Sequence, residues 1–390
     1  MKRFVKITPK VVEYAWGNKD FIPSLIGMPV DEKPKAEMWM GTHPGAPSLI
    51  SDTNQTLEDF LVDNSHFFSI DHLKLYNDKL PFLFKVLAIE KPLSIQCHPD
   101  YREAKIGYDE EREFRKKNPR NLWNYKDDNR KAEVIYALTP ITAMCGFLSD
   151  EEIVTNLKTY IPNGFEKYIS PLISEGENKA KTIFEYIYTV DENILKDLIS
   201  ELLKNVAPCE NKKGEFFTKE GIINRVKTEF PTDRGLFAPL LLNVVHLNKG
   251  EALYLEPRLL HAYVYGNGIE LMSASDNVLR GGLTNKKMDV DELMKVMIIK
   301  PLKIKLCKQF IDSNGKTVID TPTDEFTLAV YKKGEYDIRT ENLEMLLFFE
   351  DSTMEVKGEV IPVKKGSVYV VAANTHFKLS TNGDVFVATC

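Results

Sequence analysis

Residues 250–266, GEALYLEPRLLHAYVYG, contain two strand-like runs on either side of a turn that includes Pro257. Residues two apart in a strand share a face, so His261 and Tyr263 lie on one face of the second run. A glycine, a proline and then a histidine suit the turn into a metal-binding strand of a β-barrel. Taken alone, His261 equally suits a structural histidine. The stretch therefore predicts β structure, and other residues must decide whether it carries a metal site.

The rest of the chain divides by the spacing of its apolar residues. Short β-rich runs separated by Pro, Gly and Asn fill residues 1–148, and similar runs continue from residue 250 to the end of the chain. Between them, pairs such as Ile153 and Leu157 recur at the three-and-four spacing of amphipathic helices. Ser149, followed by acidic residues, suits a helix N-terminus. We expect a mainly β protein with a helical insertion.

The composition limits the class of protein. Hydrophobic residues make up 43% and charged residues 28% of the 390 residues, as in soluble globular proteins. A net charge of -6 gives no positive field that would gather nucleic acid. The longest apolar stretch, residues 239–245, is too short to cross a bilayer, which takes about 20 residues. Five scattered cysteines without a CxxC pair are typical of reduced thiols. We expect a cytoplasmic protein, a monomer rather than an obligate oligomer, with no nucleic-acid or membrane partner.

In a second strand-like segment, PLSIQCHPD at residues 92–100, polar and apolar residues alternate. Its polar residues Ser94, Gln96 and His98 point one way, while Ile95 and Cys97 point the other. Gln and His are potential metal donors at a spacing that lets them converge. Hydrogen-bonded residues on a strand surface would explain this segment by itself equally well.

A third segment, RKAEVIYAL at residues 130–138, places Lys131 and Glu133 on one face of an apolar strand. A structural salt bridge would explain this pair as well. Together, however, the segments offer two imidazoles, a carboxylate and an amide oxygen, a donor set that suits Zn, Mn, Fe or Co. Four protein donors would leave room for water or substrate oxygens, and the ion would act as a Lewis acid.

Several cations accompany these strands. Lys85 interrupts the apolar run LPFLFKVL and should need an anionic partner if it points inward. Arg280 and Lys286 lie in DNVLRGGLTNKK. The chain has neither a Walker A pattern nor GxGxxG, so a phosphate loop for nucleotides is not supported. A sugar phosphate held by side chains fits these cations better.

These segments resemble a known family. LPFLFKVL, SIQCHPD, the K-x-E of RKAEVIYAL, MCGF, HAY and the block at residues 266–293 are similar to the signature segments of type I mannose-6-phosphate isomerases, in the cupin superfamily. YAWG and AEMWMGTHPGAPS near the N-terminus are similar too. The resemblance covers about residues 5 to 300 and is weakest through the helical stretch. The chain departs from the usual pattern at four positions, Arg130 in place of His, Ala132 in place of Pro, Gly281 in place of Ala and Asn285 in place of Pro.

The resemblance implies a fold and a set of site residues. The fold would be a cupin-type β-barrel (jelly-roll) catalytic domain over residues 1–148 and 237–303, a helical insertion domain over 149–236, and a C-terminal β domain, itself cupin-like, over 304–390. The metal, Zn²⁺ by resemblance, would be bound by Gln96, His98, Glu133 and His261. The substrate pocket would be lined by Ser94, Lys85, Lys131, Lys286 and Tyr263, with Arg280, Glu270 and Asp276 close by.

The implied activity is the interconversion of mannose 6-phosphate and fructose 6-phosphate through an enediol, which would feed mannose and GDP-mannose metabolism. That chemistry needs a base for the carbon-bound proton and positive charge for the oxygen that becomes negative. Arg280 with the metal suits the second task, and Asp276 or Glu270 suits the first. Two alternatives stay open, a cupin metal oxygenase, because two His and a carboxylate can bind iron, and a non-catalytic sugar-phosphate-binding cupin, which the Arg130 departure would allow.

Overall fold

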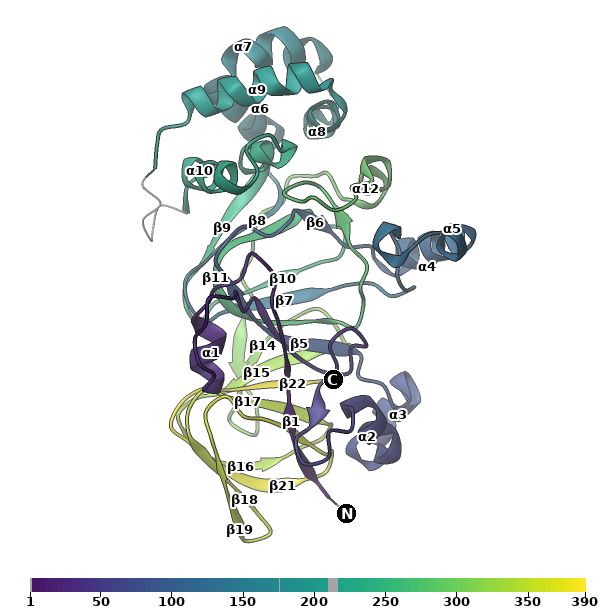
Figure 1. The fold of residues 1–390 in the computed structure, drawn as a ribbon, viewed down its shortest axis with the longest axis vertical. Coiled ribbons are helices and arrows are strands. Elements are labelled where there is room, and N and C mark those ends of the chain that lie inside the picture. The colour runs from purple at the N-terminus through teal and green to yellow at the C-terminus, as the bar shows by residue number, and fades with distance from the viewer. Residues whose placement is uncertain (1, 175, 210–216) are drawn as a thin grey trace.

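The computed structural model describes residues 2–174, 176–209 and 217–390. Along the long axis of the molecule, a group of helices lies at one end, a ten-stranded sheet in the middle and the C-terminal strands at the other end (Figure 1). Within the described residues, no helix is both long and apolar enough to span a membrane. Helices and antiparallel sheets are therefore both major components of the fold.

The central sheet is organised around one long strand, β11 (His261–Ser273). Its second half pairs with β5 (Phe82–Ile89) and β7 (Glu133–Ala137), and its first half pairs with β6 (Gln96–Cys97) and β8 (Ile141–Phe147), all antiparallel. Every residue of β5, β7 and β8 is buried, which explains their nearly continuous apolar sequences. The remaining strands of this sheet are β2 (Lys10–Val12), β3 (Glu37–Met40), β9 (Leu242–Leu247), β10 (Ala252–Leu255) and β12 (Leu279–Arg280).

Helices fill the chain between β8 and β9, as the apolar spacing predicted. Ser149 caps the first of them in a capping box with Glu152. The predicted apolar positions, among them Ile153 and Leu157, are buried together in one core with the outer side of β6 and β8. We call this part the helical region; it contains α6 (Asp150–Tyr160), α7 (Pro162–Gly164), α8 (Lys179–Thr189), α9 (Glu192–Asn205), α10 (Lys219–Glu229) and α11 (Ala238–Leu241).

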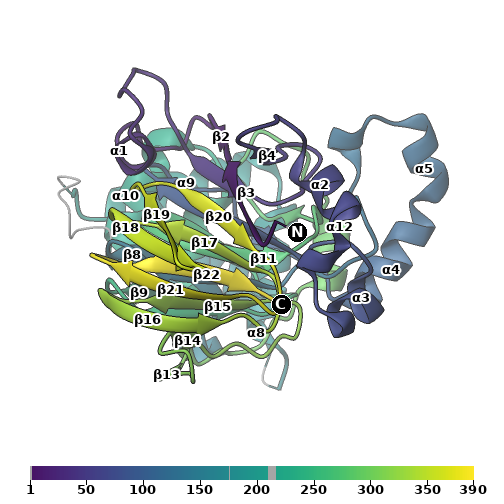
Figure 2. The ribbon, with the colours of Figure 1, turned by 90° about the horizontal axis from the view of Figure 1, so that it is seen from below.

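The C-terminal strands form an eight-stranded and a four-stranded sheet, which pack on each other around residues such as Tyr331 and Phe348. Seen from below, these strands lie across the end of the molecule (Figure 2). They are β13 (Gln309–Ile311), β14 (Thr317–Ile319), β15 (Thr327–Tyr331), β16 (Gly334–Arg339), β17 (Glu344–Phe348), β18 (Ser352–Val356), β19 (Glu359–Val363), β20 (Val368–Val371), β21 (His376–Thr381) and β22 (Val385–Thr389). Two N-terminal strands, β1 (Phe4–Thr8) and β4 (Leu49–Ile50), complete the larger sheet, because β1 pairs with β20.

The mostly β texture expected for residues 1–148 is wrong where the structure has helices. Thr56, Ser69 and Asp100 each cap a helix by accepting a backbone N–H with the side chain. These short helices lie at the periphery, and the mixed-charge run that begins at Asp109 is mostly exposed helix. The helices outside the helical region are α1 (Phe21–Ile26), α2 (Leu57–Asp63), α3 (Ile70–Tyr76), α4 (Tyr101–Glu110), α5 (Arg112–Lys117) and α12 (Val290–Val296).

Candidate active site

A cleft of about 690 Å³ opens between the central sheet, the helical region and the loop that follows β12. The predicted site residues come from strands and loops far apart in the chain, and all of them except His98 line this cleft. His98 lies directly behind the lining, only 2% exposed, against Glu133. The structure therefore brings the complete predicted set together.

Three neighbouring strands carry one row of site residues. In the ladder β12–β6–β11, Arg280 pairs with Gln96, and Gln96 pairs with His261. Directly opposite residues in antiparallel strands project their side chains to the same face. Arg280, Gln96 and His261 therefore stand side by side on the cleft face of the sheet.

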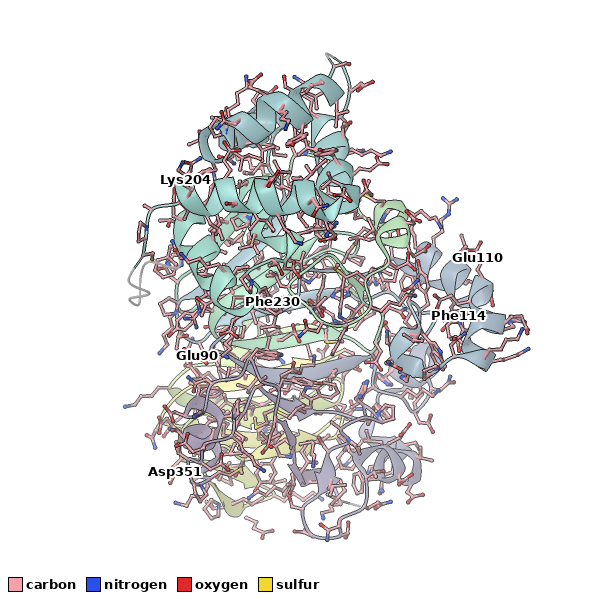
Figure 3. The ribbon with its side chains drawn as sticks, turned by 45° about the horizontal axis from the view of Figure 1, so that its top comes forward. Glu90, Glu110, Phe114, Lys204, Phe230 and Asp351 are labelled. Atoms are coloured by element: carbon pink, nitrogen blue, oxygen red, sulfur yellow. The ribbon has the colours of Figure 1, made fainter. Side chains whose placement is uncertain are left out.

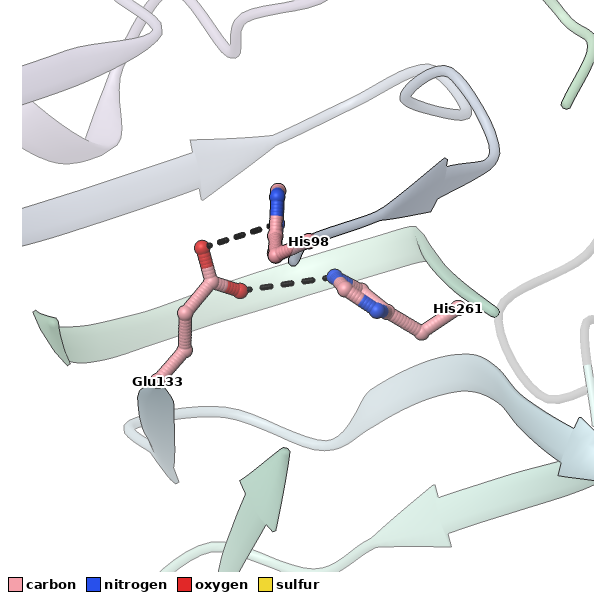
Figure 4. Close-up of side chains that lie close together, drawn as sticks. All are labelled: His98, Glu133 and His261. Carbon is pink, nitrogen blue, oxygen red and sulfur yellow. Dashed lines mark ion pairs between the residues drawn. The ribbon is translucent and has the colours of Figure 1, made fainter. Parts of the chain in front are cut away.

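His98, Glu133 and His261 form a buried trio (Figure 4). One oxygen of Glu133, Oε1, lies 3.3 Å from Nε2 of His98, and the other, Oε2, lies 3.4 Å from Nε2 of His261. The Nδ1 atoms face backbone carbonyl oxygens, that of Asn277 at 2.7 Å and that of Leu259 at 2.9 Å. A carbonyl oxygen only accepts, so Nδ1 carries the hydrogen of each neutral ring and Nε2 presents a lone pair.

The donor chemistry of this trio suits a divalent cation. Burial, aided by the charge of Lys131, lowers the pKa of His98 to about 3, so its ring is neutral at physiological pH. Burial alone would raise the pKa of Glu133, but Lys131 and the histidines lower it well below its ordinary value. The lone pair of His98 Nε2 thus faces an ionised carboxylate, and Nε2 of His261 is directed at the same carboxylate. A metal ion between these atoms would stabilise the arrangement. The Lys131 ammonium lies beside the trio, with Nζ 2.6 Å from Glu133 Oε1 and 3.3 Å from His98 Nε2.

Gln96 can add a fourth donor to the trio. Its amide N–H donates to Ser94 Oγ at 3.1 Å, and this hydrogen bond fixes the orientation of the amide group. An amide held in this way offers its oxygen as a ligand, and its place opposite His261 in the ladder directs it into the cleft. With it, the two imidazoles, the carboxylate and the amide oxygen would make up the quartet of donors expected from the sequence.

A second charged group lies on the sheet beside the trio. Lys85 Nζ is 3.0 Å from Glu270 Oε2 and 3.6 Å from Glu37 Oε2, and all three side chains are buried. Lys85 therefore has the anionic partner that the sequence required. Burial raises the pKa of Glu270 despite the opposing charge of Lys85. Burial, with the charges of Glu133 and Glu270, raises the pKa of Tyr263 well above its ordinary value, so the phenol remains a proton donor.

Three cations of the cleft, Arg280, Lys126 and Lys286, have no ion-pair partner within 4.0 Å in the described part of the chain. Lys126 lies beside Arg280, and burial together with the Arg280 charge lowers its pKa to about 8. Burial and the same charge lower the pKa of Lys286. Arg280 Nε has no hydrogen-bond partner within the described part of the chain. Two lysines that Arg280 repels, together with Arg280 itself, favour an anionic ligand in the cleft. The sequence analysis missed Lys126, because a single lysine in a polar loop belongs to no periodic pattern.

Asp276 lies in a network that the sequence analysis also missed. His43 Nε2 donates to Asp276 Oδ1 at 2.9 Å, since Gly45 N–H donates to the other ring nitrogen of His43. Arg120 donates to Asp276 Oδ2 at 2.7 Å. Burial would raise the pKa of Asp276, but His43 and Arg120 lower it far below its ordinary value. Both oxygens are thus occupied and the carboxylate is held ionised, which makes Asp276 a poorer proton carrier than Glu270.

Arg130, which stands where the resembled family usually has His, turns away from the cleft. Its guanidinium donates to Glu325 Oε2 at 3.1 Å and to Thr323 Oγ1 at 2.8 Å, both ahead of the C-terminal strand β15. Arg130 therefore links β7 to the C-terminal sheets and contributes no group to the cleft lining.

Comparisons with known proteins agree with this geometry. A family model described as the catalytic domain of type I phosphomannose isomerase matches residues 4–149. The chain is 33% identical to the mannose-6-phosphate isomerase of Schizosaccharomyces pombe over 97% of this chain and 98% of that protein. It is 32% identical to the Escherichia coli mannose-6-phosphate isomerase over 95% of each chain. A solved structure of mannose 6-phosphate isomerase bound with zinc and yttrium superimposes with a TM-score of 0.88, at 29% identity, over 100% of this chain and 99% of that one. A mutant of the Salmonella typhimurium enzyme gives the same TM-score and coverage. The chain belongs to the type I mannose-6-phosphate isomerase family.

Proposed function

We propose that this protein is a zinc-dependent isomerase that interconverts mannose 6-phosphate and fructose 6-phosphate. The observation that carries the proposal is the trio of His98, Glu133 and His261, whose donor atoms converge beside a cleft that also holds the Lys85–Glu270 pair and a group of uncompensated cations. Membership of the family gives the reaction, and the cleft supplies residues suited to each part of it.

The metal would be held by Gln96, His98, Glu133 and His261. Zinc suits this mixture of imidazole, carboxylate and amide donors, and a solved relative binds zinc. When bound, the ion supplies Lewis-acid charge that polarises the substrate oxygens at C1 and C2. The Nδ1 hydrogen bonds to the carbonyls of Asn277 and Leu259 would keep both rings in the tautomer that ligation needs.

Glu270 is the best placed carrier for the proton that moves between C1 and C2. A carboxyl whose pKa is raised by burial exchanges a proton near neutral pH more readily than one held ionised. Asp276 remains in the proposed catalytic set as an anchor for His43 and Arg120. Arg280, next to Gln96 in the ladder, would stabilise the negative oxygen of the enediolate, and the protonated Tyr263 would donate to a substrate hydroxyl or carbonyl oxygen.

The phosphate group would bind to the cations around Arg280 in the cleft. Lys85 and Lys131 are already paired with buried carboxylates, so they suit the sugar hydroxyls better than a dianion. Lys286 and Lys126, flanked by Arg280, carry charges that no carboxylate compensates as closely. Ser94, which fixes Gln96, would add a hydroxyl for substrate on the metal side.

The domain division is part of the same proposal. We assign residues 1–148 and 237–303 to a cupin-type catalytic barrel, 149–236 to the helical insertion and 304–390 to a C-terminal β domain. The pairing of β1 with β20 supports one adjustment, because it ties the first strand of the chain to the C-terminal sheet. We further propose that the protein acts as a monomer in the cytoplasm. Sedimentation of the purified chain as a stable oligomer would contradict the proposed monomeric state.

The direct test mixes metal-replete protein with mannose 6-phosphate and follows the appearance of fructose 6-phosphate. Conversion at enzymatic rates is expected, and its absence with metal present would refute the proposal. Oxygen consumption by an iron-loaded sample, without isomerisation, would favour the oxygenase alternative instead.

A further inference from the structure

The loop at residues 279–286 carries two of the proposed ligand-binding cations, Arg280 and Lys286. On its inner side it is attached to the segment that bears the metal ligand Gln96. Gly281 N–H donates to the carbonyl of Ile95 at 2.8 Å, and Ile95 N–H donates to the carbonyl of Gly282 at 3.0 Å. The position of the loop relative to the metal site is therefore set on this side by backbone pairing.

On its outer side the loop is attached to the helical region. The hydroxyl of Tyr188, in α8, donates to the carbonyl oxygen of Gly281. Asp233 Oδ1 accepts from the backbone N–H of Leu283 at 3.0 Å. These two hydrogen bonds hold the loop on either side of Gly282. The first ends on Gly281, one residue after Arg280, and the second on Leu283, three residues before Lys286.

The contact between loop and helical region is close. A Cβ at Gly282 would lie 2.9 Å from Asp233 Oδ1 and 3.2 Å from the backbone of Gly235, and the φ of Gly282 is +128°. Leu283 has a φ of 54°, a left-handed conformation that is unfavourable for a leucine. Such a conformation persists only where its surroundings fix it, and the Asp233 hydrogen bond is a contact that does so.

Both outer contacts belong to rigid parts of the helical region. The Tyr188 ring is buried and stacks on Phe184, with 3.9 Å between ring centroids. The turn of Asp233 is anchored by its neighbour Arg234, which donates to Glu192 Oε1 at 2.8 Å and to the carbonyl of Val190 at 3.0 Å. The helical region also reaches the cleft at the end of α10, where Phe230 contributes to the lining (Figure 3).

We propose that Tyr188 and Asp233 are positioning residues for this isomerase, which fix the loop so that Arg280 and Lys286 face the substrate phosphate and the reacting oxygens. The inference rests on the proposed function and assigns a task to the helical region. Its contacts end on the backbone of the cation-bearing loop, so a shift of the helical region would move both cations relative to Gln96.

The test uses the full-length, zinc-loaded protein with matched controls. Tyr188→Phe and Asp233→Ala each remove one outer contact, while Asp233→Asn keeps the accepting oxygen and should rescue. Tyr160→Phe and Thr218→Ala are the controls, because the Tyr160 hydroxyl donates to Glu220 and Thr218 caps α10, both within the helical region. The readouts are calorimetric binding of inorganic phosphate, kcat and KM for mannose 6-phosphate, zinc content and melting temperature.

We expect Tyr188→Phe and Asp233→Ala each to weaken phosphate binding by about 2- to 12-fold, the factor that one hydrogen bond of ordinary strength is worth, and to raise KM by a similar factor. Zinc content should be unchanged, and Asp233→Asn and both controls should bind phosphate like the wild type. Phosphate binding by the two test variants equal to that of their controls would overturn the inference. Failure of the wild type to isomerise mannose 6-phosphate would instead refute the proposed function, and phosphate binding would still test the loop.

Discussion

Replacement of Lys85 by methionine tests the charge balance of the cleft. The Lys85 ammonium is 7% exposed and lies between Glu270 and Glu37, at 3.0 and 3.6 Å. Methionine keeps the unbranched shape but leaves two buried carboxylates without their cation. Breaking a buried ion pair from one side costs about 3–5 kcal/mol of folding free energy, and this is the loss expected for Lys85→Met at neutral and higher pH.

The loss should depend on pH with a definite sign. Burial already raises the pKa of Glu270, and without Lys85 its folded-state pKa rises further above the unfolded value of about 4.3. The folded variant then binds a proton that the unfolded chain has released. Its free energy of unfolding should therefore fall by about 1.4 kcal/mol per pH unit between the unfolded and the folded pKa. More of the stability should therefore be retained at pH 5 than at pH 8, because the lower pH favours the protonated form of Glu270 in the folded variant.

Urea titrations of wild type, Lys85→Met and Lys85→Met/Glu270→Gln at pH 5 and pH 8 measure this effect. The double variant removes Glu270, the nearer of the two carboxylates that Lys85 compensates, so it should recover part of the stability at pH 8. An equal loss at both pH values, or a double variant no more stable than Lys85→Met at pH 8, would refute the assignment of a buried, charge-balanced Lys85–Glu270 pair.

Three further outcomes are expected. His261→Ala should bind zinc at least 10-fold more weakly and lose activity with it, as metal analysis after dialysis would show; unchanged zinc content would remove His261 from the metal site. Arg280→Ala should reduce kcat about 10²- to 10³-fold with zinc retained, and wild-type kcat would exclude Arg280 from the mechanism. Lys126, with a pKa of about 8, would bind the phosphate dianion only when protonated, so kcat/KM for mannose 6-phosphate should fall above pH 8. Lys126→Met should lower kcat/KM below pH 8 and abolish that fall; a profile identical to wild type would exclude the role.

The proposed metal ligands could be selected from sequence because strand alternation is a local property. Strand β6 is only two residues long, with prolines at 92 and 99 on either side, yet the alternation extends beyond it. Ile95 and Cys97 pack into the core of the helical region, while Gln96 faces the cleft. The two-residue period therefore indicated the correct faces even where the strand itself is minimal.

The remaining site residues depend on contacts between distant parts of the chain. His43 and Arg120 meet Asp276 across more than 150 residues of sequence, and the pKa of Lys126 is lowered by burial and by the charge of Arg280. No local spacing encodes such pairs. The helices of the first 148 residues were missed for a different reason, since six to ten residues are too short to show apolar periodicity, although their capping residues were visible in the sequence.

The shape of the cleft depends on a β-bulge in β11, which the alternation of residues along the sequence does not predict. His261 and Glu270 are nine residues apart, so a regular strand would direct them to opposite faces and separate them by about 30 Å. Both nevertheless line one cleft. The register of β11 against β8 shifts between Tyr263 and Tyr265, a bulge that inserts one residue and restores the shared face. Directly after it, Gly266 has a φ of +115°, and a Cβ there would lie 2.4 Å from the carbonyl oxygen of Pro140, so only glycine permits this close approach at the bend. The bulge and the glycine thus let one strand present a proposed metal ligand from its first half and the proposed proton carrier from its second half to the same cleft.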